Sequence, residues 1–275
     1  MTDLASKVVL VTGATDGLGQ GIVRALAHER ATVLVHGRDA GRAEALAAEL
    51  RAAGAPVRVY LADLASLAEV RALAGAVLVG EPRLDVLVCN AGIGSTVPTP
   101  ERVESRDGIE LRFAVNYLSH YLLTRALLPR LRASAPARIV NVASAGQTAI
   151  DFDDPMITRG YSGARAYCQS KLAQILSTFD LAEETAGTGV TVNALHPATF
   201  MPTKIVANPI STIDEGVQAT MRLICDPSLT GMSGKYFNGM HEATAEAQAY
   251  DAEARARLRA LSDQLIAAAG SRPPG

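Results

Sequence analysis

Short apolar runs, rich in β-branched residues, recur along the chain and contain few polar positions. Runs of this kind are typical of strands buried on both faces of a parallel sheet. They predict strands over Val8–Thr12, Thr32–His36, Val57–Leu61, Leu84–Cys89, Arg138–Val142 and Val190–Leu195. Between these runs, apolar residues recur at helical spacing. That spacing predicts helices over Gly19–Glu29, Ala40–Ala53, Leu67–Val79, Asp107–Arg132 and Tyr167–Thr185.

The alternation of strand and helix predicts one α/β domain. Its expected form is a single-domain Rossmann-type fold: a doubly wound parallel sheet with helices on both faces. No linker interrupts residues 1–240, and residues 241–275 are expected to be a C-terminal helical extension of the same domain. A helix predicted over His241–Ala269 carries Leu258, Leu261 and Leu265 on one face.

Charge and composition exclude several classes of function. The net charge is −2 and no Lys/Arg cluster is present, which argues against a nucleic-acid-binding surface. The longest apolar runs are far shorter than the ~20 residues of a membrane span, and no signal peptide precedes the first strand. Cys89, Cys168 and Cys225 lack metal-ligand spacing and suit a reducing compartment. We therefore expect a soluble cytoplasmic protein without a metal site.

A glycine-rich segment, residues 12–19, follows the first predicted strand and opens the first helix. Gly13 would permit the tight turn, Gly17 would let backbone approach a pyrophosphate, and Gly19 would let the helix pack closely on the strand. A helix N-terminus also offers N–H donors and partial positive charge. The segment predicts a dinucleotide site.

The second predicted strand leads into Gly37 and Arg38. Folds that bind NAD usually place a carboxylate here, about 20 residues after the glycine loop. A guanidinium instead fits a 2′-phosphate bidentately, which favours NADP(H) over NAD(H). The alternative is that Arg38 is a solvated residue at a helix start. Asp16 would not help to bind a phosphate, and a helix cap is its simplest role.

Tyr167 and Lys171 are four residues apart on a predicted helix, so they share one face. An ammonium beside a phenol favours the phenolate and lowers the tyrosine pKa from about 10. A tyrosine tuned in this way can exchange a proton with an alcohol oxygen.

These motifs, in this order, resemble the short-chain dehydrogenase/reductase family over about residues 5–240. Within it, the chain is similar to the retinol-dehydrogenase-like and WW-domain-oxidoreductase-like branch. The matching positions are Thr12-Gly13, Gly17, Gly19, Asp63, Asn90-Ala91-Gly92, Asn116, Ser144, Tyr167 and Lys171. The resemblance implies that residues 1–240 bind NADP and hold the catalytic site.

The resemblance further implies hydride transfer between the nicotinamide and a carbonyl carbon. Tyr167 would protonate the oxygen, Ser144 would orient and polarise it, and Lys171 would lower the tyrosine pKa and reach the nicotinamide ribose. Asn116 would hold a water for proton relay beside Lys171. Enoyl reductases separate their tyrosine and lysine by six residues rather than three, which disfavours C=C reduction. The glycine spacing and C-terminal length disfavour a sugar-nucleotide epimerase.

The cofactor contacts implied by the resemblance extend along the whole sheet edge. Asp63 would contact the adenine, and either Thr199 or Thr203 would contact the carboxamide, in a segment where His196-Pro197-Ala198 replaces the family's Pro-Gly. His196 itself is expected to be packed or solvent-facing. The expected contacts are Gly13, Thr15, Asp16, Gly17, Leu18, Gly19, Arg38, Asp63, Leu64, Asn90, Ala91, Gly92, Tyr167, Lys171, Pro197, Thr199 and Thr203.

The segments expected beside the nicotinamide are mixed and contain no Lys/Arg cluster, which favours a lipophilic carbonyl or alcohol substrate. Their apolar candidates are Phe152, Met156, Ile157, Phe200 and Met201. A non-catalytic NADP(H)-binding sensor or scaffold is the alternative of another class. The resemblance also implies a homodimer or homotetramer. A stripe formed by Leu111, Val115, Leu118, Leu122 and Ala126 suits either such an interface or the face against the sheet.

Overall fold

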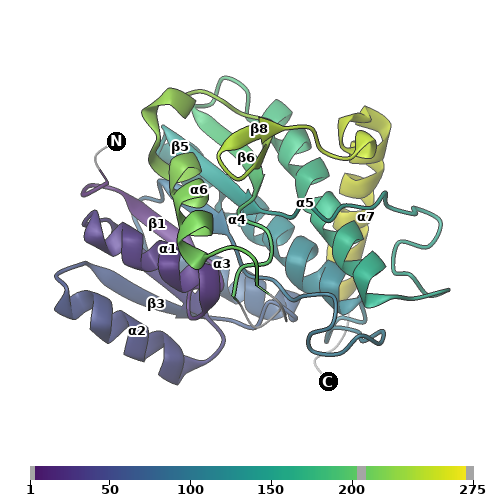
Figure 1. Ribbon diagram of the computed structural model, residues 1–275, viewed down its shortest axis with the longest axis horizontal. Coiled ribbons are helices and arrows are strands. Elements are labelled where there is room, and N and C mark those ends of the chain that lie inside the picture. Colours follow the sequence, from purple (N-terminus) through teal and green to yellow (C-terminus); the bar gives the residue numbers. More distant parts are fainter. Residues whose placement is uncertain (1–3, 203–208, 271–275) are drawn as a thin grey trace.

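The computed structural model describes residues 4–202 and 209–270, and within them one eight-stranded sheet forms (Figure 1). The strands are β1 (Val8–Val11), β2 (Thr32–Gly37), β3 (Val57–Leu61), β4 (Val86–Cys89), β5 (Ala137–Val142), β6 (Val190–His196), β7 (Lys235–Asn238) and β8 (His241–Ala243). Their order is β3-β2-β1-β4-β5-β6-β7-β8, with only the β7–β8 pair antiparallel. The predicted doubly wound fold is confirmed.

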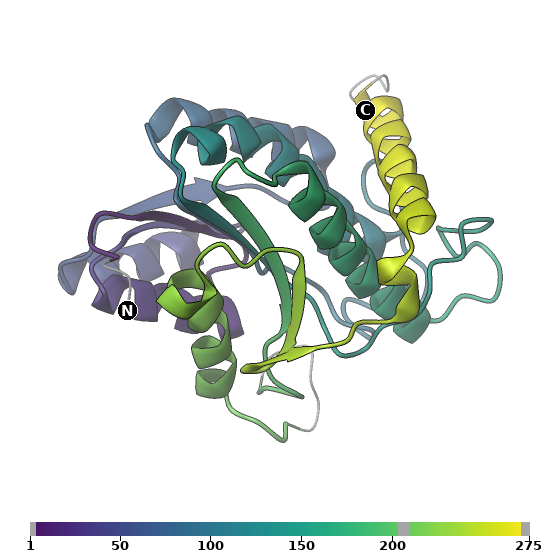
Figure 2. The same cartoon turned by 90° about the horizontal axis from the view of Figure 1, so that it is seen from above.

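Helices cover both faces of the sheet (Figure 2). In the described residues the α-helices are α1 (Gly17–His28), α2 (Ala40–Ala52), α3 (Leu67–Gly80), α4 (Ser119–Ala133), α5 (Gly163–Glu184), α6 (Ile213–Cys225) and α7 (Ala252–Gly270). Short helical segments are the π-helical η1 (Phe113–Leu118) and the 3₁₀-helical η2 (Pro227–Leu229) and η3 (Ala247–Tyr250).

The two faces of the central strands enter different hydrophobic cores, because successive side chains of a strand point in opposite directions. Val9 and Val11 of β1 pack in a core with α1, α2 and α6. Val8 and Leu10 pack in a second core with α3, α4 and α5. This burial on both faces explains why the strands read as continuous apolar runs.

Several elements differ from the sequence prediction. The long helix predicted from Asp107 begins later, and its first part is the π-helical η1. Helix α6 and strands β7 and β8 were not predicted. The helix predicted from His241 is wrong at its start: Gly239, with φ 57°, turns the chain so that His241 pairs with Asn238. Helix α7 begins only at Ala252.

Helix α7 packs along α5, where Leu258 is buried as its spacing predicted. Polar contacts fix it there: the Tyr117 hydroxyl lies 2.7 Å from Ser262 Oγ, and Arg259 donates to Asp180 at 2.5 Å. The predicted apolar stripe divides, since Leu118 is fully buried while its other four members are only half-buried. Across residues 4–202 and 209–270, no helix combines the length and hydropathy needed to cross a bilayer.

Candidate active site

The carboxyl ends of β1 and β4 lie side by side, at the point where the strand order reverses. In open α/β sheets this crevice binds ligands. Thr12 joins the two strand ends, because its Oγ1 accepts hydrogen bonds from Asn90 N and Ala91 N at 2.9 and 3.0 Å. The Asn90 side chain donates in return to Thr12 O at 2.8 Å. The glycine loop is therefore fixed against Asn90-Ala91-Gly92.

The glycines of this loop occupy positions that side chains would block. Gly13 and Gly17 have φ values of 63° and 48°, which favour glycine. A Cβ at Gly19 would lie 2.2 Å from Gly13 O. Asp16 caps α1 by accepting a hydrogen bond from Gly17 N at 2.9 Å. Gly17 and Gly19 thus leave the backbone at the start of α1 open, as close approach of a pyrophosphate requires.

Two arginines stand beyond the end of β2. Arg38 is exposed in the turn between β2 and α2. Arg42 lies four residues further on, donates from Nη2 to Thr15 O at 2.8 Å, and forms an ion pair with Asp16 Oδ2 at 3.0 Å. Arg42 was not predicted as a cofactor contact, although the sequence shows that it lies four residues after Arg38. Its guanidinium is tied to the glycine loop itself.

A buried histidine, also not predicted, supports the same loop. Gly13 N donates to His36 Nδ1 at 3.2 Å, so the ring is neutral and its Nε2 donates to Ala62 O at 3.2 Å. Burial lowers the pKa of His36 to about 4 and keeps it neutral near pH 7. His36 thereby connects the ends of three strands.

Asp63 and Leu64 follow β3 at the same edge of the sheet. Asp63 Oδ1 accepts from Ala65 N at 3.0 Å, and the Asp63 N–H donates to Glu69 at 2.7 Å. Leu64 is buried. The structure therefore brings both residues to the edge that carries the glycine loop.

Ser144, Tyr167 and Lys171 converge beyond the ends of β5 and β4. The hydroxyls of Ser144 and Tyr167 share a hydrogen bond. Lys171 Nζ stands 5.9 Å from the centroid of the Tyr167 ring. A Cβ at Gly92 would lie 3.5 Å from this Nζ, so the amine reaches the strand end of Asn90-Ala91-Gly92. These groups form one cluster at the mouth of the crevice.

The predicted effect of Lys171 on the tyrosine pKa is not what the structure shows. Burial raises the pKa of Tyr167, and the hydrogen bond with Ser144 opposes this rise. Lys171 Nζ donates to Val142 O and Gln174 Oε1, both at 2.9 Å, rather than to the phenol. Its own burial lowers the pKa of Lys171 to about 7. The ammonium is thus held beside the ring instead of against its oxygen.

Asn116 lies in the π-helical η1 and braces the loop after β4. Its Oδ1 accepts from Ile93 N at 2.8 Å, and its Nδ2 donates to Ile93 O at 3.1 Å and to Ser170 Oγ at 2.9 Å. Its backbone carbonyl accepts from His120 Nδ1 at 3.0 Å. Asn116 therefore connects the strand end at Gly92 with the helix that carries Tyr167.

The segment after β6 borders a pocket next to α6. Pro197 and Thr199 line a cavity of about 390 Å³ together with residues of α6 and of the β7–β8 turn. His196 is buried, and its Nε2 lies 3.0 Å from Thr199 Oγ1, which agrees with a packed rather than a catalytic role. Thr203 lies outside the described residues.

The comparison with known proteins agrees with this geometry. A family model for the short chain dehydrogenase matches residues 7–213. The chain belongs to the short-chain dehydrogenase family. Retinol dehydrogenase 13 of Homo sapiens is 37% identical over 288 residues, covering 96% of this chain and 85% of that protein. Retinol dehydrogenase 14 of Mus musculus is 37% identical, with coverages of 94% and 86%. The chain is thus an oxidoreductase of the retinol-dehydrogenase-like branch.

Solved structures show the same fold. An uncharacterized protein from Mycobacterium paratuberculosis has a TM-score of 0.82 at 32% identity, covering 97% of this chain and 96% of its own. The RhlG/NADP complex of Pseudomonas aeruginosa has a TM-score of 0.68 at 28% identity, with coverages of 88% and 100%. A 3-ketoacyl-(acyl-carrier-protein) reductase from Brucella melitensis, complexed with NADH, has a TM-score of 0.69 at 27% identity, with coverages of 86% and 97%. The fold accordingly binds a nicotinamide cofactor.

Proposed function

We propose that this protein transfers hydride between NADP(H) and a carbonyl or alcohol carbon of a lipophilic small molecule. The observation that carries the proposal is the convergence of Ser144, Tyr167 and Lys171 beside Gly92, at the mouth of a crevice whose glycine loop fits a dinucleotide. Carbonyl reduction requires a proton donor next to the bound nicotinamide, because the proton and the hydride are transferred to adjacent atoms of the substrate.

The chemistry assigned to each residue follows from its contacts. The nicotinamide, when bound, supplies or accepts the hydride. Tyr167 gives its proton to the carbonyl oxygen in reduction and takes one from the alcohol in oxidation. Gly146 N donates to Ser144 Oγ at 3.1 Å and fixes the hydroxyl, which would turn its O–H from Tyr167 to the same substrate oxygen when substrate binds.

Lys171 holds an amine beside the tyrosine, although it does not lower the tyrosine pKa in the protein alone. Its Nζ lies 5.9 Å from the ring centroid, where a protonated amine would interact electrostatically with a phenolate formed when Tyr167 gives up its proton. The pKa of about 7 means that this amine is partly protonated near neutral pH. The hydrogen bonds to Val142 O and Gln174 Oε1 hold the amine in place without neutralising it.

The preference for NADP(H) rests on Arg38 and Arg42. Both follow β2, where the 2′ position of an adenosine ribose is expected. Asp39, the nearest carboxylate in sequence, accepts a hydrogen bond from Arg42 N at 3.0 Å and caps α2. A carboxylate used as a cap is poorly placed to bind a ribose hydroxyl, whereas the exposed Arg38 suits a phosphate, and Arg42 has N–H donors beyond the Nη2 contacts that it makes with the glycine loop.

A lipophilic substrate is supported by only some of the predicted apolar residues. Phe200 is 58% exposed, and Phe152 and Met156 are half-buried. Ile157 is fully buried in the core, so its predicted contact with substrate is wrong. Met201 packs against Gly216 of α6. The three free thiols fit the cytoplasm, which we propose as the location.

The experiment that tests this function follows NADPH absorbance with purified protein and a panel of lipophilic ketones and aldehydes. NADPH consumption that depends on the carbonyl compound supports an oxidoreductase. Binding of NADPH without any turnover across the panel would instead favour the sensor or scaffold. Parallel assays with NADH then test the cofactor preference.

A further inference from the structure

The cluster that hydride transfer leaves unexplained is centred on Arg112, which is fully buried at the start of the π-helical segment. Burying a guanidinium is costly unless its donors and its charge are both satisfied. Here Nε donates to Gly94 O at 2.9 Å, and Nη2 donates to Ser95 O at 2.7 Å and to Thr99 O at 2.5 Å. Three carbonyls of a single loop are thus gathered on one side chain.

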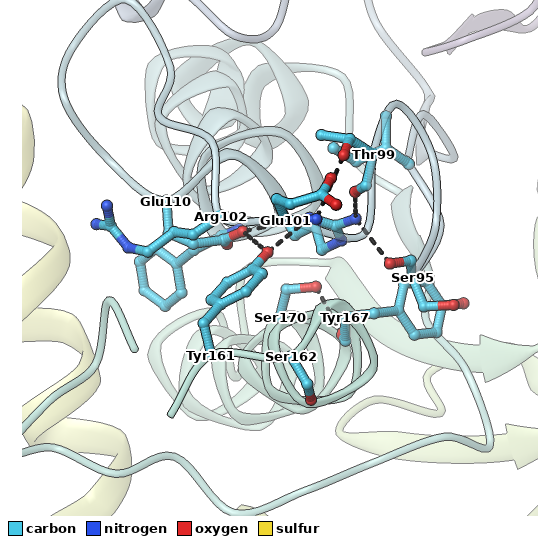
Figure 3. Close-up of polar contacts among 12 residues, drawn as sticks. Ser95, Thr99, Glu101, Arg102, Glu110, Tyr161, Ser162, Tyr167 and Ser170 are labelled. Atoms are coloured by element: carbon cyan, nitrogen blue, oxygen red, sulfur yellow. Dashed lines mark hydrogen bonds and ion pairs between the residues drawn. The ribbon is translucent and has the colours of Figure 1, made fainter. Parts of the chain in front are cut away.

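The remaining contacts of the guanidinium run to the segment before α5. Arg112 Nη1 donates to the Tyr161 hydroxyl at 2.6 Å. That hydroxyl donates to Glu110 Oε1 at 2.9 Å (Figure 3). Glu110 Oε1 also lies 3.7 Å from Arg112 Nη1, and Glu110 Oε2 accepts a hydrogen bond from Phe113 N at 2.7 Å. The charge is therefore balanced, and four of the five N–H donors are used within the protein. Little donor capacity is left for an anionic substrate.

The loop held by Arg112 begins beside the catalytic cluster. We call residues 93–102 the β4 loop, since it continues from Asn90-Ala91-Gly92. Asn116 binds Ile93, and Arg112, four residues earlier on the same helical segment, binds the next part of the loop. Asn116 fixes the start of the β4 loop beside Lys171, and Arg112 fixes the part of the loop that follows.

The β4 loop also presses against the first turn of the helix that carries Tyr167. A Cβ at Gly163 would lie only 2.0 Å from Ser95 O and 3.2 Å from Arg112 Nη2. Tyr167 follows one helical turn after Gly163. The β4 loop is therefore packed against α5 one turn before Tyr167, so a shift of the loop would change the space beside the tyrosine.

We infer that Arg112 is a positioning residue: it holds the β4 loop as a wall of the substrate site and so determines which carbonyl compounds reach Tyr167. This inference rests on the proposed function. Burial raises the pKa of Tyr161 to about 12, so its hydroxyl keeps the proton that it donates to Glu110. Arg112 is fully buried, so it would act through the backbone of residues 94–99 rather than by direct contact with substrate.

The test compares Arg112→Met, Tyr161→Phe and Gly163→Ala in NADPH-consumption assays with one small and one bulky ketone. Displacing a wall by about 1 Å can cost on the order of 100-fold. We expect kcat/KM for the bulky ketone to fall at least about 10-fold through KM, with KM for NADPH within about twofold. Gly75→Ala is the matched control, because a Cβ there meets nothing within 4 Å.

The outcomes distinguish a failure of this inference from a failure of the proposed function. An inactive wild type contradicts the proposed function and the inference with it. An active wild type, together with folded Tyr161→Phe and Gly163→Ala variants whose KM for both ketones is unchanged, overturns the inference alone. Should Arg112→Met fail to fold, these two variants decide. Faster amide hydrogen exchange at residues 94–99 in Tyr161→Phe, with unchanged exchange in Gly75→Ala, is the expected independent sign of a released loop.

Discussion

Lys171 Nζ lies 5.9 Å from the ring centroid of Tyr167, yet it donates its hydrogen bonds to Val142 O and Gln174 Oε1. The amine is held by a carbonyl at the end of β5 and by a side chain of its own helix, α5. This arrangement fixes a cation beside the phenol without a direct hydrogen bond between them. The tyrosine can therefore remain protonated, ready to donate, while the phenolate that follows is stabilised.

Replacing Lys171 with Met should lower kcat for carbonyl reduction by about 100-fold or more, because general acid catalysis by Tyr167 loses its supporting cation. NADPH-consumption kinetics measure this. Lys235→Met is the control, since Lys235 forms an exposed ion pair with Glu242 far along the chain. Equal kcat values for both variants would contradict the role of Lys171.

Replacing Arg42 with Ala should raise KM for NADPH by about 10-fold and leave KM for NADH nearly unchanged, because hydrogen bonds to a charged phosphate contribute about 1.5–3 kcal/mol. Arg38→Ala should act in the same direction. Arg24→Ala, which removes an exposed ion pair between Arg24 of α1 and Glu49 of α2, is the control. A matched loss for both cofactors would show that Arg42 supports the loop rather than a phosphate.

The buried histidines should make the protein less stable in mild acid. Burial lowers the pKa of His120, like that of His36, from 6.5 to about 4. The unfolded chain therefore binds protons that the folded one does not, so stability is lost as the pH falls from 6.5 to 4. His120→Gln should show a smaller fall in Tm over this range than wild type. His28→Gln, at an exposed position, should match wild type, and the same fall in all three proteins would refute the assignment.

Helix α7 should contribute to stability through Leu258, which is 1% exposed. Leu258→Ala should lower the free energy of unfolding by about 2–5 kcal/mol, because it leaves a cavity between α7 and α5. Val79→Ala, at a 91% exposed position, should change it by less than about 0.5 kcal/mol. Chemical denaturation measures both. A small effect at Leu258 would indicate that α7 is only loosely attached.

The fold was predictable because strands buried on both faces of a parallel sheet must consist mostly of apolar residues. The elements near the end of the sheet were harder to predict. Strand β8 has only three residues, and nothing in its apolar pattern marks it, although Asn238-Gly239 signals a hairpin turn. Helix α6 was missed although Thr212 and Glu215 form a capping box, a signal that sequence can carry.

The candidate site was predictable as a set of residues but not as a set of contacts. Spacing alone placed Tyr167 and Lys171 on one face. The partners of Lys171 depend on packing between β5 and α5, which no local pattern reports. Arg112 is the clearest case: its acceptors lie in the β4 loop and before α5, 13 to 49 residues away in sequence. A buried charge of this kind becomes visible only when the chain is folded.

The most direct test of the account is NADPH consumption by Tyr167→Phe, with a carbonyl compound that wild type reduces. The variant lacks the proton that reduction requires, and we expect turnover to fall about 100-fold or more while NADPH binding, measured by fluorescence, is unchanged. Tyr250→Phe, altered at a tyrosine outside the site, should retain wild-type turnover. A Tyr167→Phe protein that keeps a tenth of the wild-type rate would contradict the assignment of Tyr167 as the acid and base.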